Sequence, residues 1–148
     1  MLKLPPPVWA LIYVLGAAAI SWLLRWPLAP GLPQPAVGIA IFFASWIAPV
    51  WAVVLFRRAG TELRPDSPAN SSLVTTSPFG FTRNPMYLGL VMASFGVAVW
   101  AGAWPMFAAP IAVFMTAAFV HSPFEEAKMR RQFGDAYDDY AAKVRRWI

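Results

Sequence analysis

Two long runs without a charged residue constrain this chain most strongly. They extend from Val8 to Leu24 and from Ala36 to Phe56. Each has about the 17–25 residues that an α-helix needs to cross the roughly 30 Å hydrocarbon core of a bilayer. Because lipid cannot bond to backbone N–H and C=O groups, such runs are expected to be helical. The sequence therefore predicts an all-α integral membrane protein.

A third apolar stretch is too long for one span. It is uncharged from Met86 to His121, and Gly102-Ala103-Trp104-Pro105 in its middle supplies turn residues. We expect an antiparallel helical hairpin here, and kinks at Pro49 and Pro110, which lie inside predicted spans. A single membrane domain, 1–148, then contains four transmembrane helices. They are expected at about residues 8–24, 36–56, 86–104 and 105–121.

The composition supports this class and excludes several chemistries. Hydrophobic residues make up 59% of the chain and charged residues only 13%, against about 45–50% and about 25% in soluble domains. The net charge is +5, and the charged residues lie between the apolar runs. We therefore expect this protein to contact membrane lipids and not nucleic acid. With no cysteine and one histidine, thiol nucleophiles, Cys-ligated metals and multi-histidine metal sites are excluded, and we expect no metal.

The basic residues predict the orientation in the membrane. Four spans place both termini on one side, where eleven of the twelve Lys and Arg residues then lie, leaving only Arg25 on the other. By the positive-inside rule the basic side is cytoplasmic. We therefore expect cytoplasmic termini and a cytoplasmic loop at residues 57–85.

A C-terminal amphipathic segment is predicted at residues 123–148. Pro123 is expected to open a helix through Phe133, Gly134 to end it, and Asp135 to cap a second helix. Basic residues, Arg146 among them, lie off its apolar stripe. We expect them to face anionic headgroups, with the stripe against lipid or the bundle. The stripe consists of Met129, Phe133, Tyr137, Tyr140, Ala141, Val144 and Ile148.

Two polar motifs flank the predicted hairpin. Arg83-Asn84-Pro85-Met86-Tyr87 leads into the third span, and His121-Ser122-Pro123-Phe124-Glu125-Glu126 leaves the fourth. If these spans form a hairpin, the two motifs meet at its mouth. An arginine, an amide, a phenol and two carboxylates would then lie together at the interface, a group able to hold a charged cofactor beside lipid.

These motifs carry a family resemblance. The segment Arg83–Gly89, the Glu125-Glu126 pair and the segment Phe133–Trp147 resemble the isoprenylcysteine carboxyl methyltransferase and phospholipid methyltransferase superfamily, in its small bacterial branch. The resemblance covers residues 73–148. It implies a bacterial inner-membrane enzyme in which the hairpin and the C-terminal segment enclose S-adenosylmethionine, and whose substrate enters from the bilayer.

The resemblance also implies the site residues. Arg83 and Tyr87 are expected to act in catalysis, and Tyr137 and Tyr140 fit either the apolar face of their helix or a lid over the cofactor. The glycine usual before the first motif is Ser77 here. The residues expected to bind the cofactor are Arg83, Asn84, Pro85, Tyr87, Glu125, Glu126, Tyr137 and Tyr140.

The chemistry of the donor supports the same assignment. Carboxylates and aromatic faces suit its sulfonium and ammonium groups, and an arginine suits its carboxylate. Methyl transfer needs positioning and exclusion of water rather than a nucleophile on the protein. We therefore predict S-adenosylmethionine-dependent methylation of a lipophilic acceptor.

Two other functions stay open. The first is a sterol-reductase-like oxidoreductase that uses NADPH, which would need more basic residues around a larger pocket. The second is a non-catalytic membrane protein, in which Glu125 and Glu126 merely favour a helix N-terminus. In the methyltransferase, the small residues Gly89, Ala93 and Gly96 would leave a groove for an acyl or prenyl chain, unless a neighbouring helix fills it. His121 is interpreted as an interfacial residue, and most tryptophans as interface anchors.

Overall fold

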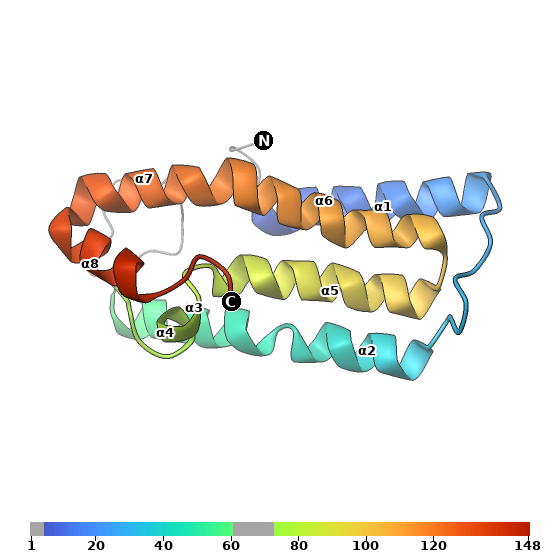
Figure 1. Ribbon diagram of the computed structural model, residues 1–148. Helices are drawn as coiled ribbons and strands as arrows, with labels where there is room; N and C mark the ends of the chain where they lie inside the picture. Colours follow the sequence, from blue (N-terminus) through green and yellow to red (C-terminus); the bar gives the residue numbers. More distant parts are fainter. Residues whose placement is uncertain (1–4, 61–72) are drawn as a thin grey trace.

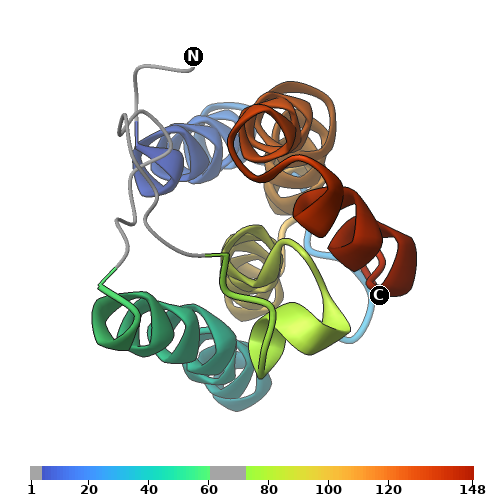
Figure 2. The same ribbon diagram turned by 90° about the vertical axis from the view of Figure 1, so that its left-hand side faces the viewer.

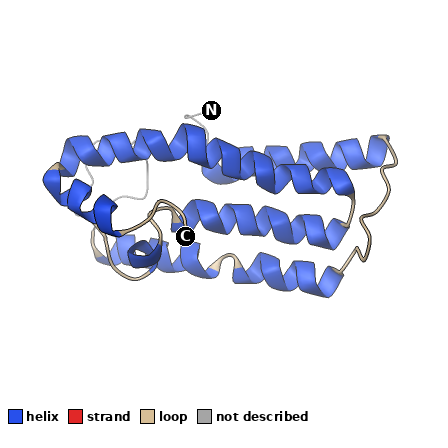
Figure 3. Cartoon of the chain, in the orientation of Figure 1, coloured by secondary structure: helices blue, strands red, loops and turns tan. Residues whose placement is uncertain are grey.

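The chain is a bundle of long helices. The computed structural model describes residues 5–60 and 73–148, and Figures 1 and 3 show that these residues are helices and loops without a strand. A short α4 (Pro78–Phe81), a 3₁₀ turn η1 (Trp104–Phe107) and a π-helical turn η2 (Ala117–His121) accompany the longer helices. The longer helices are α1 (Pro6–Leu23), α2 (Pro35–Ala44), α3 (Ile47–Arg58), α5 (Pro85–Ala101), α6 (Ala108–Thr116), α7 (Ser122–Phe133) and α8 (Asp135–Lys143).

Three helices are long and apolar enough to cross a membrane: Pro6–Leu23, Pro35–Arg58 and Trp104–Phe133. The remaining predicted span, the third, corresponds to α5, an apolar helix of 17 residues. The all-α, membrane-type architecture is thereby confirmed. The count of four spans stays a prediction, because α5 is shorter than the other three.

Helix α5 lies at the centre of the bundle. It packs against α2 and α3 on one side and against α6 and α1 on the other, as Figures 1 and 2 show. The outer helices keep large apolar side chains exposed, including Leu15 at 58% and Trp22 at 80%. Such contiguous apolar surface is what a helix facing lipid requires.

The predicted turn between the third and fourth spans is confirmed. Helix α5 ends at Ala101, and Gly102 adopts a φ of +76°, a left-handed conformation that favours glycine. The chain re-enters a helix at Trp104, and α5 and α6 then pack side by side (Figure 1). The two polar motifs therefore come to the same end of the hairpin.

The two prolines inside the predicted spans have different effects. Between α2 and α3 the helix is interrupted at Ser45 and Trp46, four and three residues before Pro49. Because proline has no N–H, it cannot bond to the Ser45 carbonyl, and its ring crowds that oxygen. Pro110 is the third residue of α6, where an N–H has no helical partner, so no break follows.

Of the two alternatives for the small residues of the third predicted span, the structure shows that a neighbouring helix fills the space beside them. A Cβ added to Gly96 would lie 2.8 Å from the Gly38 carbonyl oxygen, and a Cβ on Gly89 would collide with Pro49. The small residues of α5 thus let α2 and α3 approach closely. An apolar groove of about 670 Å³ lies elsewhere, between α1 and η1–α6, with Tyr13 and Trp104 in its lining.

The basic residues gather at one end of the bundle. Among the Lys and Arg residues that the structure describes, all except Arg25 lie where α3 ends, α5 begins and α7 and α8 fold over (Figure 1). Lys3 and Arg64 fall outside the described residues. The charge asymmetry of the predicted topology is therefore present in the fold, while the side of the membrane stays a prediction.

The C-terminal stripe faces the bundle rather than lipid. Helix α7 ends at Phe133, Gly134 follows with a φ of +52°, and α8 turns back toward α4 (Figure 2). Ile148 alone departs from the predicted stripe, because it is 83% exposed. The other members pack with Ala52 and Phe79 of α3 and α4; they are Met129, Phe133, Tyr137, Tyr140, Ala141 and Val144.

Candidate functional site

The two polar motifs meet, as the sequence predicts. The Tyr87 hydroxyl donates a hydrogen bond of 2.6 Å to Glu125 Oε1. Beside it, Arg83 Nη1 lies 3.3 Å from Glu126 Oε1. These contacts join the start of α5 to the first turns of α7, at the basic end of the bundle.

Local sequence explains this placement. Pro85 has the fixed φ that suits the first residue of a helix, so α5 begins directly after Asn84. Arg83 precedes the helix and Tyr87 follows within its first turn. On the other side, the π-helical turn η2 precedes α7 and thereby sets the rotation at which Glu125 and Glu126 face α5.

Arg146 completes the charged part of the site. Its Nε and Nη2 atoms donate to the two oxygens of Glu126, each at 2.7 Å. The Glu126 side chain is 6% exposed and that of Arg146 38%. The sequence predicts that Arg146 faces lipid headgroups; instead it is drawn inward, because a buried carboxylate requires a bidentate cationic partner.

The C-terminal tail, residues 144–148, runs across the first motif. The backbone N–H of Arg83 donates to the Arg145 carbonyl at 3.0 Å. Thr82 Oγ1 and Asn84 Nδ2 both donate to the Arg146 carbonyl, at 3.0 and 3.1 Å. Asn84 therefore holds the tail, and the tail in turn carries Arg146 to Glu126.

Arg83 retains donors that no described residue uses. Its Nε and Nη1 are buried without a hydrogen bond, since Nη1 approaches Glu126 in an orientation that makes only an ion pair. One carboxylate between two guanidinium groups also leaves this cluster with a net charge of +1. Unused guanidinium donors and a positive charge suit a carboxylate ligand. The residues thus fit the carboxylate of an amino-acid-like cofactor.

The two tyrosines of α8 differ in their contacts. The Tyr140 hydroxyl donates to the Phe79 carbonyl at 2.7 Å, so it anchors α8 to α4. The Tyr137 ring lies 5.7 Å from the Arg130 guanidinium.

Burial raises the pKa of both phenols, and hydrogen bonding to Glu126 raises the pKa of Arg146. Both phenols thus stay protonated, and Arg146 stays charged, at neutral pH.

The backbone at Ser77 has a conformation that favours glycine. Ser77 has φ +58° and ψ −121°, a combination that residues other than glycine rarely adopt. It directly precedes α4, whose Pro78 and Phe79 are buried beneath α8. The position therefore has a backbone conformation that favours glycine, although serine occupies it.

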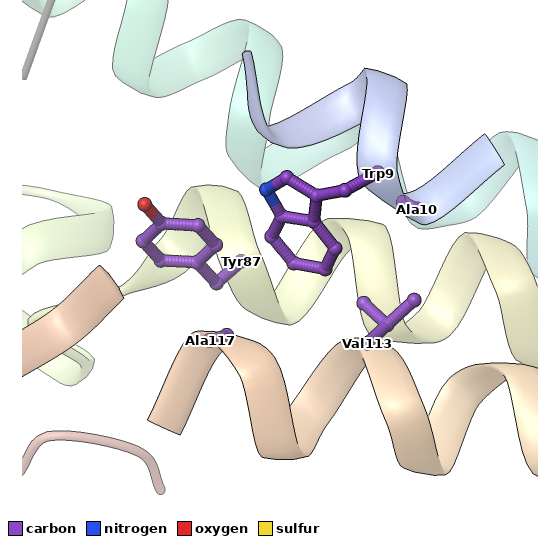
Figure 4. Packing of buried hydrophobic residues seen from close by; sticks show 5 residues of the cluster. All are labelled: Trp9, Ala10, Tyr87, Val113 and Ala117. Carbon is purple, nitrogen blue, oxygen red and sulfur yellow. The ribbon is translucent and has the colours of Figure 1, made fainter. Parts of the chain in front are cut away.

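Two residues near the site escaped sequence reasoning. From the sequence, His121 and most tryptophans are expected at the membrane interface, yet Trp9 and His121 are 2% and 4% exposed and their rings stack at 5.0 Å between centroids. Tyr87 packs beside both of them. Figure 4 shows Trp9 and Tyr87 in this cluster between α1, α5 and α6. The only signal available in advance was that an ionisable residue lies within an apolar helix.

Comparison with known proteins identifies the family. The family described as phospholipid methyltransferase matches residues 33–136, which contain α2 to α7 and both polar motifs. Trp9 and Arg146 lie outside the matched residues. No curated protein and no solved structure matches the chain. Because the match covers more than half of the chain, this protein belongs to the phospholipid methyltransferase family.

Proposed function

We propose that this protein is an S-adenosylmethionine-dependent methyltransferase that acts on a lipophilic acceptor from the bilayer. The observation that supports this most directly is the Arg83–Glu126–Arg146 cluster, which keeps buried guanidinium donors unused beside an apolar bundle. Membership of a methyltransferase family supports the reaction class. When bound, S-adenosylmethionine would supply an electrophilic methyl group on a sulfonium.

The two carboxylates of the site would have different roles in cofactor binding. Arg83 and Arg146 would hold the carboxylate of the cofactor, and Glu126 would keep both guanidinium groups in place. Glu125, bonded to the Tyr87 hydroxyl, would accept hydrogen bonds from the ammonium or ribose groups. This assignment differs from the expectation that both carboxylates bind the cofactor directly, because Glu126 already has two cationic partners.

The C-terminal tail and α8 would close the site toward water. The tail is bonded to Thr82, Arg83 and Asn84, and α8 is anchored to α4 through Tyr140. Excluding water strengthens the charged interactions and leaves the sulfonium without competing nucleophiles. The exposed apolar surfaces of α1 and α2 leave the bilayer as the route by which an apolar acceptor arrives.

Titration with S-adenosylhomocysteine tests the proposal. The detergent-purified protein should bind it, and Arg83→Lys should weaken binding about ten- to hundredfold, since an ammonium cannot replace a bidentate guanidinium. Arg131→Lys, on the exposed face of α7, is the matched control and should bind like the parent. Absence of binding by the parent would refute the proposed function. Equal affinities for the parent and Arg83→Lys would remove Arg83 from the site.

The orientation in the membrane is tested by cysteine labelling. The chain has no cysteine, so single substitutions are clean probes. If the basic end is cytoplasmic, an impermeant thiol reagent added outside intact cells should label Gln34→Cys and miss Asp138→Cys. Ser71→Cys, outside the described residues, should also be missed. Labelling of Asp138→Cys but not Gln34→Cys would reverse the topology.

A further inference from the structure

Three aromatic rings from three helices meet next to the proposed cofactor site. Trp9 of α1 stacks on His121 of η2, with 15° between the ring planes. Tyr87 of α5 lies 6.4 Å from Trp9 and 5.8 Å from His121, measured between ring centroids. All three residues are more than nine-tenths buried. We call these residues the ring cluster.

The ring cluster contains polar atoms that no described residue satisfies. Trp9 Nε1 and His121 Nε2 are buried and make no hydrogen bond within residues 5–60 and 73–148. The Tyr87 hydroxyl, in contrast, donates a hydrogen bond to Glu125. In Figure 4 the Trp9 nitrogen and the Tyr87 oxygen each lie at the left-hand end of their ring. Since buried polar groups are nearly always paired, two unpaired nitrogens on stacked rings indicate a place for a ligand.

The helix that carries His121 is irregular at this residue. The π-helical turn η2 ends at His121, within a longer helix that is otherwise α-helical beyond its first 3₁₀ turn. Such turns are uncommon and often mark functional sites. Here the extra residue brings His121 against Trp9 while α7 still presents Glu125 to Tyr87. The irregularity thus serves the ring cluster and the proposed cofactor site together.

We propose that Trp9 and His121 bind the polar group of the methyl acceptor, and that His121 takes its proton. This inference rests on the proposed function. An indole N–H can only donate a hydrogen bond, and a neutral imidazole with its hydrogen on Nδ1 presents a lone pair on Nε2. The pair therefore fits an acceptor that carries an N–H or O–H, an amine or a hydroxyl. A carboxylate has no proton to offer and would face the Nε2 lone pair with its own.

Methyl transfer to this acceptor would be a single displacement with one proton transfer. The acceptor nitrogen or oxygen forms a bond to the methyl carbon while the S–CH₃ bond breaks, and that electron pair stays on sulfur, which becomes a neutral thioether. The N–H or O–H proton passes to His121 Nε2, which gives an imidazolium that later returns the proton to water. Tyr87 contacts His121 within the ring cluster and donates to Glu125, so it would connect the two halves of the site.

Labelling experiments separate this inference from the proposed function. Membranes with the protein receive methyl-labelled S-adenosylmethionine, and label is counted in the organic extract. His121→Gln should lower transfer by about 10²–10⁴-fold, because a positioned base contributes that much. Its affinity for S-adenosylhomocysteine should stay within about threefold of the parent. The control is Thr116→Val, which removes a buried hydroxyl from the preceding helix and should transfer like the parent.

The other outcomes would contradict the role of His121, the protic acceptor or the proposed function. Transfer by His121→Gln within about threefold of the parent would overturn the role of His121 while leaving the methyltransferase proposal intact. A parent that binds S-adenosylhomocysteine but labels no extractable product would overturn the protic lipid acceptor. A parent that does not bind S-adenosylhomocysteine would instead refute the proposed function.

A second measurement needs no variant and no turnover. The chain has a single histidine, so nitrogen-15 histidine labelling yields one imidazole signal set in the NMR spectrum. Dodecylamine or dodecanol, added to the detergent-solubilised protein, should shift the Nε2 resonance, and dodecanoate should not. Trp9→Phe should weaken the response. Absence of a shift with both protic probes, or an equal shift with dodecanoate, would overturn the proposed acceptor site.

Discussion

Glu126→Gln is expected to be the most damaging single change at the charged cluster. It should lower the free energy of unfolding by about 3 kcal/mol, the low end for breaking a buried ion pair, because Arg146 is 38% exposed. An amide keeps the shape of the side chain but no longer balances two guanidinium groups. Binding of S-adenosylhomocysteine should fall about ten- to hundredfold, because Arg83 and Arg146 lose the group that orients them.

An exposed ion pair provides the control. Arg130 Nε lies 2.9 Å from Asp138 Oδ1, but both side chains are at least half exposed. Asp138→Asn should therefore change the free energy of unfolding by at most about 1 kcal/mol. Denaturation of the purified proteins, followed by circular dichroism, measures both variants. If Glu126→Gln is no more destabilising than Asp138→Asn, the buried cluster does not stabilise the fold.

The second large effect is expected where α2 and α5 approach most closely. A Cβ on Gly96 would lie 2.8 Å from the Gly38 carbonyl oxygen and 2.8 Å from the Phe42 nitrogen, both backbone atoms. Gly96→Ala should therefore force the helices apart and lower the free energy of unfolding by about 1–3 kcal/mol. The same denaturation measurement reports this loss.

Gly16 of α1 provides the matched control. A Cβ added there meets no atom within 4 Å, so Gly16→Ala adds a methyl group without a collision. It should leave stability unchanged or raise it by about 0.5–1 kcal/mol, since alanine favours helices more than glycine does. A Gly96→Ala protein as stable as Gly16→Ala would contradict the close helix contact.

The parts of the fold that follow from local chemistry were predictable. Gly102 and Pro105 mark the hairpin turn. A left-handed backbone position favours glycine, and the first turn of a helix accommodates proline. The stripe from Met129 to Val144 was predictable from its spacing, since α7 and α8 bury one face of a regular helix. Once the hairpin was predicted, the meeting of Arg83 with Glu126 followed from the chain direction.

What the sequence could not predict depends on contacts between distant residues. Arg146 reads as one of several C-terminal basic residues, and only the folded tail brings it to Glu126. Trp9 and His121 are 112 positions apart, and nothing local indicates that their rings stack. The filling of the groove at Gly89 likewise required the break before Pro49, which lets that ring reach α5.

The π-helical turn η2 has a consequence for how this family member can vary. Each residue added to or removed from an α-helix rotates everything beyond it by about 100°. The extra residue between Thr116 and Ser122 therefore acts as a rotational setting for all of α7. Losing one residue there would turn Glu125 and Glu126 away from α5 without altering either carboxylate. Insertions and deletions should consequently be selected against in this short segment, because they would change the direction in which both carboxylates face.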